Sequence, residues 1–313
     1  MVEINEITIP VPWGYMAAKT WGSSNNCPIL MIHGRQDNAG SFDLLIPKLP
    51  ESYYYICIDL PSHGKSSHFP PNIPINITNF VVAVTYVINY FKWEKITIIA
   101  HSLGARVACH VALTYPRLIE RLVFLDSISI YPVHPGDFGD YTRENIEKFA
   151  KVTEKLQKNS PPEYTADEAL ERIMENRPTT ICKEGALNML NRALIPLENG
   201  RFHLSMDQRL KCIFYDLLSS ENVAAVIKYC RFKFPHLVLL ASETNNLLFN
   251  KSSEPILREL KKNQNCRIII VNGNHDVHNN NADLVARYIN IFLEKYPTPE
   301  YYKKSKKLIQ AKI

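Results

Sequence analysis

Short runs of apolar and β-branched residues alternate along most of the chain with segments whose apolar residues recur every three or four positions. The short runs predict β-strands at residues 6–10, 14–21, 28–34, 53–60, 95–101, 120–127, 236–242 and 266–273. The longer segments predict helices at 78–91, 102–116 and 282–296, the second ending at Pro116. The middle and late strands are apolar at nearly every position, which is typical of parallel strands covered by helices on both faces. We therefore predict an α/β fold built on a mostly parallel, doubly wound sheet of about eight strands.

The strand pattern disappears between residues 131 and 233. Polar helical stretches at 141–158 and 165–176 replace it, and Pro132 and Pro135 mark its entrance. Strands of one sheet resume afterwards, so this is an insertion in one domain, and long insertions on a rigid scaffold usually carry function. We predict an all-helical cap, giving four parts: core 1–130, cap 131–233, core 234–300 and a basic tail 301–313.

The net charge of +5 on 313 residues does not indicate a nucleic-acid partner. Five lysines near the C-terminus account for most of it: Lys303, Lys304, Lys306, Lys307 and Lys312. The remainder is nearly neutral and has no basic stripe interleaved with aromatic residues, as nucleic-acid binding would require. No apolar segment approaches the roughly 18 residues that a membrane span needs.

Seven cysteines without a CxxC pair favour free thiols in a reducing compartment. The N-terminal residues lack a positive region followed by an apolar stretch, so we predict an intracellular, not a secreted, protein. No metal-ligand cluster or nucleotide-binding loop indicates a cofactor, and the oligomeric state is not indicated.

The segment ITIIAHSLGARVA at residues 96–108 carries the main chemical signal. A buried strand runs into a helix through a tight turn with Ser102 at its apex, and the small residues Ala100 and Gly104 lie two positions before and after it. This is the G-x-S-x-G nucleophile elbow with Ala replacing the first Gly. The N–H of Leu103, at the start of the helix, is a candidate oxyanion donor. The simpler alternative is that Ser102 only caps the helix.

A second oxyanion donor is expected in HGRQDNAGSF, residues 33–42, after the third strand. We expect Gly34 to let the backbone turn so that the N–H of Arg35 faces the site. His33 precedes the turn, and we interpret its ring as a brace for the loop.

The general base is expected late in the chain, because this fold orders its triad as serine, acid, histidine. His275 follows the last predicted strand in VNGNHDVH, where it would face the serine at the carboxyl edge of the sheet. An imidazole there would take the hydroxyl proton and return it to the leaving group. His278 is the rival candidate.

Two carboxylates compete for the third position of the triad. Only Glu243 lies in LLASETNNLLFN (239–250), after the seventh predicted strand, where the acid is usually found. Asp126 ends the sixth strand in VFLDSIS. Both remain open, as does a site without an acid.

These motifs together resemble the epoxide-hydrolase and haloalkane-dehalogenase branch of the α/β hydrolases, and within it the serine-hydrolase-like proteins of animals. The resemblance rests on residues 33–49, 58–67, 98–108 and 272–293 and on the cap. Epoxide hydrolases and dehalogenases have Asp at the nucleophile position, whereas Ser102 suits acyl transfer. The resemblance implies esterase activity, and it implies that Asp59, Pro61 and Gly64 shape a loop beside the pocket.

We accordingly predict a carboxylic-ester hydrolase acting on a small or medium apolar acyl substrate between core and cap. The alternative is a non-catalytic small-molecule-binding protein of the same fold. The polar cap disfavours a lipase acting at a membrane surface. Ala311, Lys312 and Ile313 resemble the peroxisomal S-K-L signal, so an import receptor is a possible partner and the location is cytosolic or peroxisomal; a frayed tail without a signal is the default.

Overall fold

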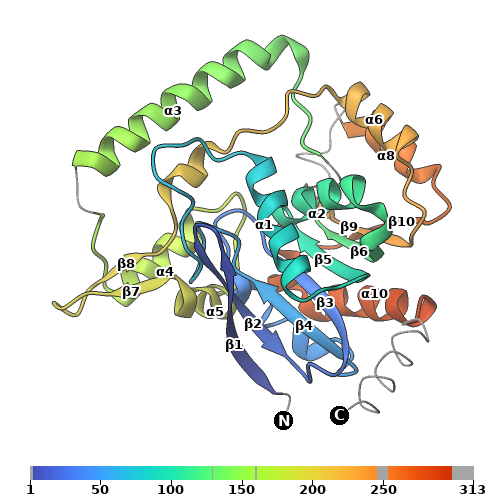
Figure 1. Ribbon diagram of the computed structural model, residues 1–313, viewed down its shortest axis with the longest axis horizontal. Coiled ribbons are helices and arrows are strands. Elements are labelled where there is room, and N and C mark those ends of the chain that lie inside the picture. The colour runs from blue at the N-terminus through green and yellow to red at the C-terminus, as the bar shows by residue number, and fades with distance from the viewer. Residues whose placement is uncertain (1–2, 129, 159–160, 245–252, 298–313) are drawn as a thin grey trace.

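The computed structural model describes residues 3–128, 130–158, 161–244 and 253–297, which form a layered α/β domain with a cap (Figure 1). Its centre is an eight-stranded sheet in the order β1-β2-β4-β3-β5-β6-β9-β10. The strands are β1 (Ile4–Val11), β2 (Gly14–Trp21), β3 (Cys27–Ile32), β4 (Tyr53–Ile58), β5 (Ile96–His101), β6 (Ile119–Leu125), β9 (His236–Ala241) and β10 (Cys266–Val271). The β1–β2 and β2–β4 pairs are antiparallel and all other neighbours are parallel. The predicted α/β-hydrolase fold class is confirmed.

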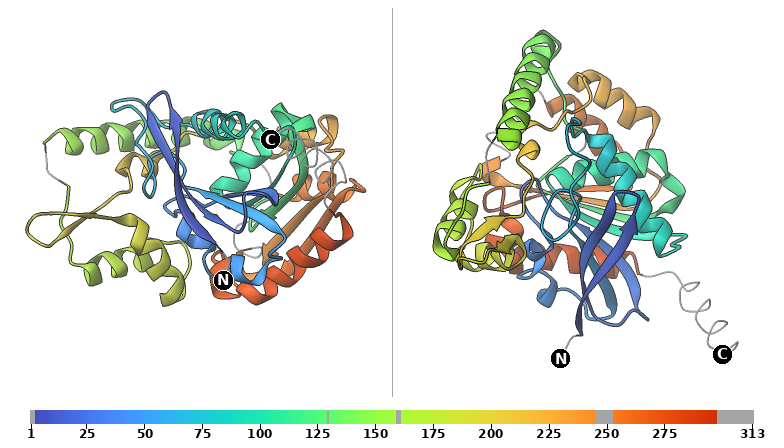
Figure 2. Two further views of the ribbon diagram at one scale, coloured as in Figure 1. Left: turned by 60° about the horizontal axis from the view of Figure 1, so that its bottom comes forward. Right: turned by 60° about the vertical axis from the view of Figure 1, so that its left-hand side comes forward.

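Helices cover both faces of the sheet (Figures 1 and 2). One apolar cluster joins the sheet to α1 (Ile77–Tyr90), α2 (Leu103–Thr114), α6 (Ser220–Tyr229) and α8 (Glu254–Lys261). The other joins it to α10 (Ala282–Lys295) and to the short 3-10 helices η1 (Ala39–Phe42) and η2 (Ile46–Lys48). Every residue of the central strand β5 is buried, as its continuous apolar run predicts. Strand β10 lies at the edge of the sheet and has a neighbouring strand on one side only. Its Ile270 is accordingly 57% exposed.

The cap contains more than helices. Its helices are α3 (Phe138–Lys158), α4 (Ala166–Glu175) and α5 (Lys183–Ala193), followed by a β-hairpin of β7 (Leu194–Pro196) and β8 (Phe202–Leu204). The prediction of an all-helical insert is therefore wrong. The sequence signal for the hairpin is Asn199-Gly200, a dipeptide that favours tight turns, and Gly200 has φ +77°.

The two ends of the insert pack very differently. Helix α3 runs along the outer side of the molecule and buries no residue (Figures 1 and 2). Helix α6, by contrast, buries Val223, Ala224 and Ile227 in the core cluster. The remaining short elements are η3 (Pro116–Leu118), η4 (Pro135–Asp137), η5 (Gln208–Cys212) and α9 (Val277–Asn280).

All seven cysteines lie in the described residues and none is in a disulfide; Cys57, Cys109 and Cys212 are buried and Cys230 is exposed. Within the described ranges no helix is both long and apolar enough to cross a membrane. The predicted targeting tripeptide Ala311, Lys312 and Ile313 lies outside the described residues.

Candidate active site

Ser102 occupies a strained turn between β5 and α2. Its φ of 48° and ψ of −112° are unfavourable for a residue with a side chain, and its N–H donates to the carbonyl of Leu125 at 3.1 Å. The turn needs small neighbours: a Cβ added to Gly104 would lie 2.3 Å from the backbone oxygen of Ile32, and Ala100 is completely buried. This conformation holds the Ser102 side chain above the carboxyl edge of the sheet.

His275 and Asp126 complete a continuous hydrogen-bonded row with Ser102. The Nε2 atom of His275 lies 2.9 Å from Ser102 Oγ, and its Nδ1 lies 2.6 Å from Asp126 Oδ2. The N–H of Ala241 donates to the other carboxylate oxygen of Asp126 at 2.7 Å. Because Asp126 accepts a hydrogen bond from the Nδ1–H group, the lone pair of Nε2 faces the serine hydroxyl.

The rival candidates are not brought to these positions. Glu243 is exposed, and its backbone N–H donates to the carbonyl of Gly273 at 3.0 Å. His278 is buried in α9, where its ring packs on His101, with centroids 4.1 Å apart, and on Phe42. Among the described residues, the imidazole that contacts Ser102 Oγ is that of His275.

The two predicted oxyanion donors lie at the ends of β3 and β5. The N–H groups of Arg35 and Leu103 have no hydrogen-bond partner within the described part of the chain. The φ of Gly34 is not left-handed. A Cβ on Gly34 would lie 2.7 Å from His101 Nδ1, so glycine is needed for close packing; the left-handed residue in this loop is Gln36, with φ 68°.

His33 braces the loop as interpreted from the sequence. Its Nε2 accepts the N–H of Leu60 at 2.9 Å, and its Nδ1 lies 2.7 Å from the carbonyl of Gly34. Burial lowers the pKa of His33, which keeps the ring neutral and able to accept at Nε2.

The loop after β4 is organised by Asp59. Its carboxylate accepts the N–H groups of Ala39 at 2.7 Å and Lys65 at 2.8 Å, and Gly64 approaches so closely that a Cβ would lie 2.4 Å from it. Arg192, which the sequence did not single out, extends from α5 and binds Asp59 with Nη2 at 2.8 Å. The predicted loop is thus also an attachment point for the cap.

A buried ionic cluster beside the triad was missed by the sequence analysis. Arg177 comes from the cap, and its side chain is 7% exposed; its Nη1 lies 2.8 Å from Asp37 Oδ1, and it also forms an ion pair with Asp276. Asp276 directly follows His275. The cluster therefore joins the cap, the loop after β3 that contains Arg35 and the loop after β10 that contains His275, three segments that lie far apart in the sequence.

His101 connects this cluster to the triad. Its Nε2–H donates to the backbone carbonyl of His275 at 3.0 Å, and its Nδ1 lies 3.4 Å from Asp37 Oδ2. Burial would lower the pKa of His101, but its contact with Asp37 raises the pKa above its usual value. Burial would likewise raise the pKa of Asp37, but Arg177 and His101 hold it well below its usual range.

Asp37, His101 and His278 place potential metal-ligand atoms within 4.8 Å of one another, a grouping that the sequence did not predict. Each of these side chains also has a partner within the protein. The carboxylates of Asp37 and Asp276 face the guanidinium of Arg177, and Asp37 lies beside His101, whose pKa it raises.

Comparison with known proteins agrees with the fold. A family model described as the α/β hydrolase fold matches residues 28–172. The "Serine hydrolase-like protein" of Mus musculus is 31% identical over 302 residues, covering 93% of this chain and 96% of the mouse protein. "Serine hydrolase-like protein 2" of Homo sapiens is 30% identical over 304 residues, covering 93% and 94%.

Among solved structures, a hypothetical protein from Pseudomonas aeruginosa PAO1 matches with a TM-score of 0.78 at 24% identity, covering 92% of this chain and 99% of its own. The chain belongs to the serine hydrolase-like proteins of the α/β-hydrolase superfamily.

Proposed function

We propose that this protein hydrolyses carboxylic esters with Ser102 as nucleophile, His275 as general base and Asp126 as the acid of the triad. The observation that carries the proposal is the row Asp126–His275–Ser102, with contacts of 2.6 and 2.9 Å in an orientation suited to proton transfer. A serine hydroxyl is too weakly acidic to attack a carbonyl unaided near pH 7, so this contact is what makes it a nucleophile.

In the first half of the proposed reaction, His275 Nε2 takes the hydroxyl proton as Ser102 Oγ bonds to the carbonyl carbon. The carbonyl oxygen becomes an oxyanion, which the N–H groups of Arg35 and Leu103 stabilise. Asp126 stabilises the imidazolium that forms. The C–O bond to the alcohol then breaks, and His275 returns its proton to the departing alkoxide.

In the second half, a water molecule replaces the alcohol. His275 Nε2 takes a proton from this water, whose oxygen attacks the acyl-enzyme carbonyl. The bond to Ser102 Oγ breaks and the serine regains its proton from His275, so that the carboxylic acid leaves and the enzyme returns to its starting state. The buried cluster around Arg177 would hold the loops of Arg35 and His275 in register throughout.

Hydrolysis of a p-nitrophenyl ester by purified variants tests the proposal. We expect Ser102→Ala and His275→Ala each to reduce hydrolysis by at least about a thousandfold, because members of a triad act as a unit. His278→Ala should do far less. Ser23→Ala is a matched control, since Ser23 is exposed in the turn before β3.

Equal rates for the wild-type protein and Ser102→Ala would overturn the proposal and favour the non-catalytic binding protein. A larger loss in His278→Ala than in His275→Ala would mean that the base is wrongly assigned.

A further inference from the structure

A cavity of about 250 Å³ lies between the cap and the oxyanion loop. On the core side it is lined by Gln36 and Asn38, which follow closely after Arg35, the proposed oxyanion donor. Its apolar wall comes from the cap and includes Met189, Leu204 and Met206. The lining residues do not include Ser102 or His275, so an acyl chain held at Ser102 with its carbonyl oxygen at Arg35 would reach this cavity by passing along the loop of Gln36.

The charged residues that line the cavity all carry the same sign. They are Arg172 on α4, Arg177, and Lys211 on η5, and no Asp or Glu lies among the lining residues. Arg177 is already paired with Asp37 and Asp276. No ion pair is formed by Arg172 or Lys211 within the described residues, so two positive charges at the cavity are uncompensated.

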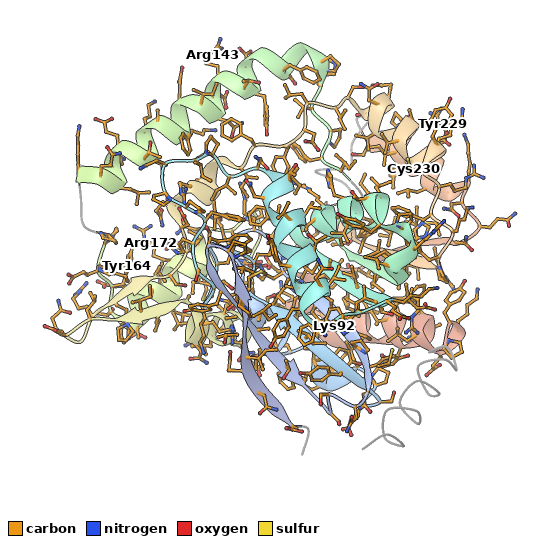
Figure 3. All side chains as sticks on the ribbon, in the orientation of Figure 1. Lys92, Arg143, Tyr164, Arg172, Tyr229 and Cys230 are labelled. Carbon is orange, nitrogen blue, oxygen red and sulfur yellow. The ribbon has the colours of Figure 1, made fainter. Side chains whose placement is uncertain are left out.

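Two other arginines of the cap are paired with carboxylates. Arg201 pairs with Glu163 and Glu168, and Arg143 on α3 pairs with Asp140. The body of the protein is also nearly neutral, because the net charge of +5 equals the five lysines of the C-terminal tail. Figure 3 shows Arg172 beside Tyr164, another lining residue, with Arg143 away from both.

We propose that this cavity binds a negatively charged end of the substrate, so that the preferred ester carries a carboxylate on its acyl chain, as in a half-ester of a dicarboxylic acid. This inference rests on the proposed hydrolase function. The apolar wall would contact the methylene chain, while Arg172 and Lys211 would bind the terminal carboxylate through charge-assisted hydrogen bonds. The inference refines the apolar acyl substrate expected from the sequence.

The test compares two esters of similar length, the p-nitrophenyl half-ester of glutaric acid and p-nitrophenyl hexanoate. We expect the wild-type kcat/KM to be at least about tenfold higher for the half-ester. The ratio of the two kcat/KM values should fall about fivefold in Arg172→Gln or Lys211→Gln and about twentyfold in the double variant, as for partly exposed charge pairs. Arg143→Gln, a matched change on α3, should leave the ratio unchanged.

Salt provides a second readout. The KM for the half-ester should rise between 50 and 500 mM NaCl, because salt screens exposed charges, while the KM for hexanoate should not. The inference would be overturned if the wild-type protein hydrolysed p-nitrophenyl hexanoate with no preference for the half-ester, or if the double variant kept the preference. Either result would leave the proposed hydrolase function intact.

Direct binding separates the inference from catalysis. The half-ester should bind Ser102→Ala in calorimetry, and adding Arg172→Gln and Lys211→Gln should weaken binding about twentyfold. Equal binding of the half-ester by Ser102→Ala and by the triple variant would overturn the inference. A chain that hydrolyses no ester would instead contradict the proposed function, and the binding result would still test the inference.

Discussion

Asp126 Oδ2 lies 2.6 Å from His275 Nδ1, although 149 residues separate the two in the sequence. Asp126 follows β6 and His275 follows β10, with β9 between these strands in the sheet. The loop after β10 must therefore reach back across the end of β9 to bring the imidazole to Ser102. Asp126 itself has φ 47° and is fixed by the N–H of Ala241.

The acid of the triad can be assigned by comparing Asp126→Asn with Glu243→Gln. We expect Asp126→Asn to lower kcat by about 10³- to 10⁴-fold, because an amide can donate to Nδ1 and so favours the wrong tautomer of His275. Glu243→Gln should stay within about twofold, since Glu243 is exposed. Steady-state hydrolysis of a p-nitrophenyl ester gives the ranking, and the reverse order would move the acid to the position after β9.

Backbone strain at Ser102 predicts an unusual order of stability between two inactive variants. Glycine adopts φ 48° and ψ −112° more readily than alanine, which relieves a strain of about 1–3 kcal/mol. Glycine also loses more entropy on folding, by about 0.5–1 kcal/mol. Ser102→Gly should thus unfold in urea with a free energy about 1 kcal/mol higher than Ser102→Ala. A less stable glycine variant would mean that the elbow is not strained.

Removing the positive charge of Arg177 should destabilise the protein severely. Arg177→Met would remove the guanidinium that pairs with the buried carboxylates of Asp37 and Asp276, which costs about 3–5 kcal/mol of unfolding free energy. The matched change Arg143→Met removes an exposed ion pair, for which we expect about 0–1 kcal/mol. Urea unfolding of both variants measures the difference, and similar losses would show that the cluster does not anchor the cap.

The strands along the chain and the turn that carries Ser102 could be predicted because each depends on a local pattern. The apolar run of β5, the small residues around the serine and the helix that follows lie within one short segment. The choice between Asp126 and Glu243 could not be predicted, because it depends on how loops after β6, β9 and β10 meet in space.

The ionic cluster was missed for a related reason. Arg177 and Asp37 belong to separate polar stretches of the sequence, and nothing local marks either side chain as buried. The cap hairpin is different: Asn199-Gly200 was an available turn signal, but its flanking strands are three residues each, too short for an alternating pattern to stand out.

Acid should destabilise the protein through His236, a buried imidazole that packs edge-on against the stacked rings of Phe232 and Phe234. Burial lowers its pKa to about 4. A histidine in the unfolded chain takes up a proton near pH 6.5. The contribution of neutral His236 to the free energy of unfolding is therefore fully present above that pH and is lost as the pH falls toward 4. Between pH 8 and pH 5 the loss from this residue is about 2 kcal/mol.

His236→Gln isolates this effect. Glutamine does not titrate, so the urea unfolding free energy of the variant should fall by about 2 kcal/mol less than that of the wild-type protein over the same pH range. The other buried histidines, such as His63 with a pKa lowered to about 3 by burial, contribute equally to both proteins. Parallel pH profiles of the unfolding free energy in the two proteins would mean that His236 does not cause the loss.

The central claim is that Ser102 is an activated nucleophile, and covalent labelling by a fluorophosphonate probe tests it most directly. Serine attacks the phosphorus, fluoride leaves, and the probe stays bound to Oγ, so intact-protein mass spectrometry counts the modified residues without knowledge of the substrate. We expect one probe per chain, located at Ser102 by peptide mapping, with no labelling of Ser102→Ala and greatly slowed labelling of His275→Ala. Absence of labelling in the wild-type protein, or equal labelling of Ser102→Ala, would contradict the account.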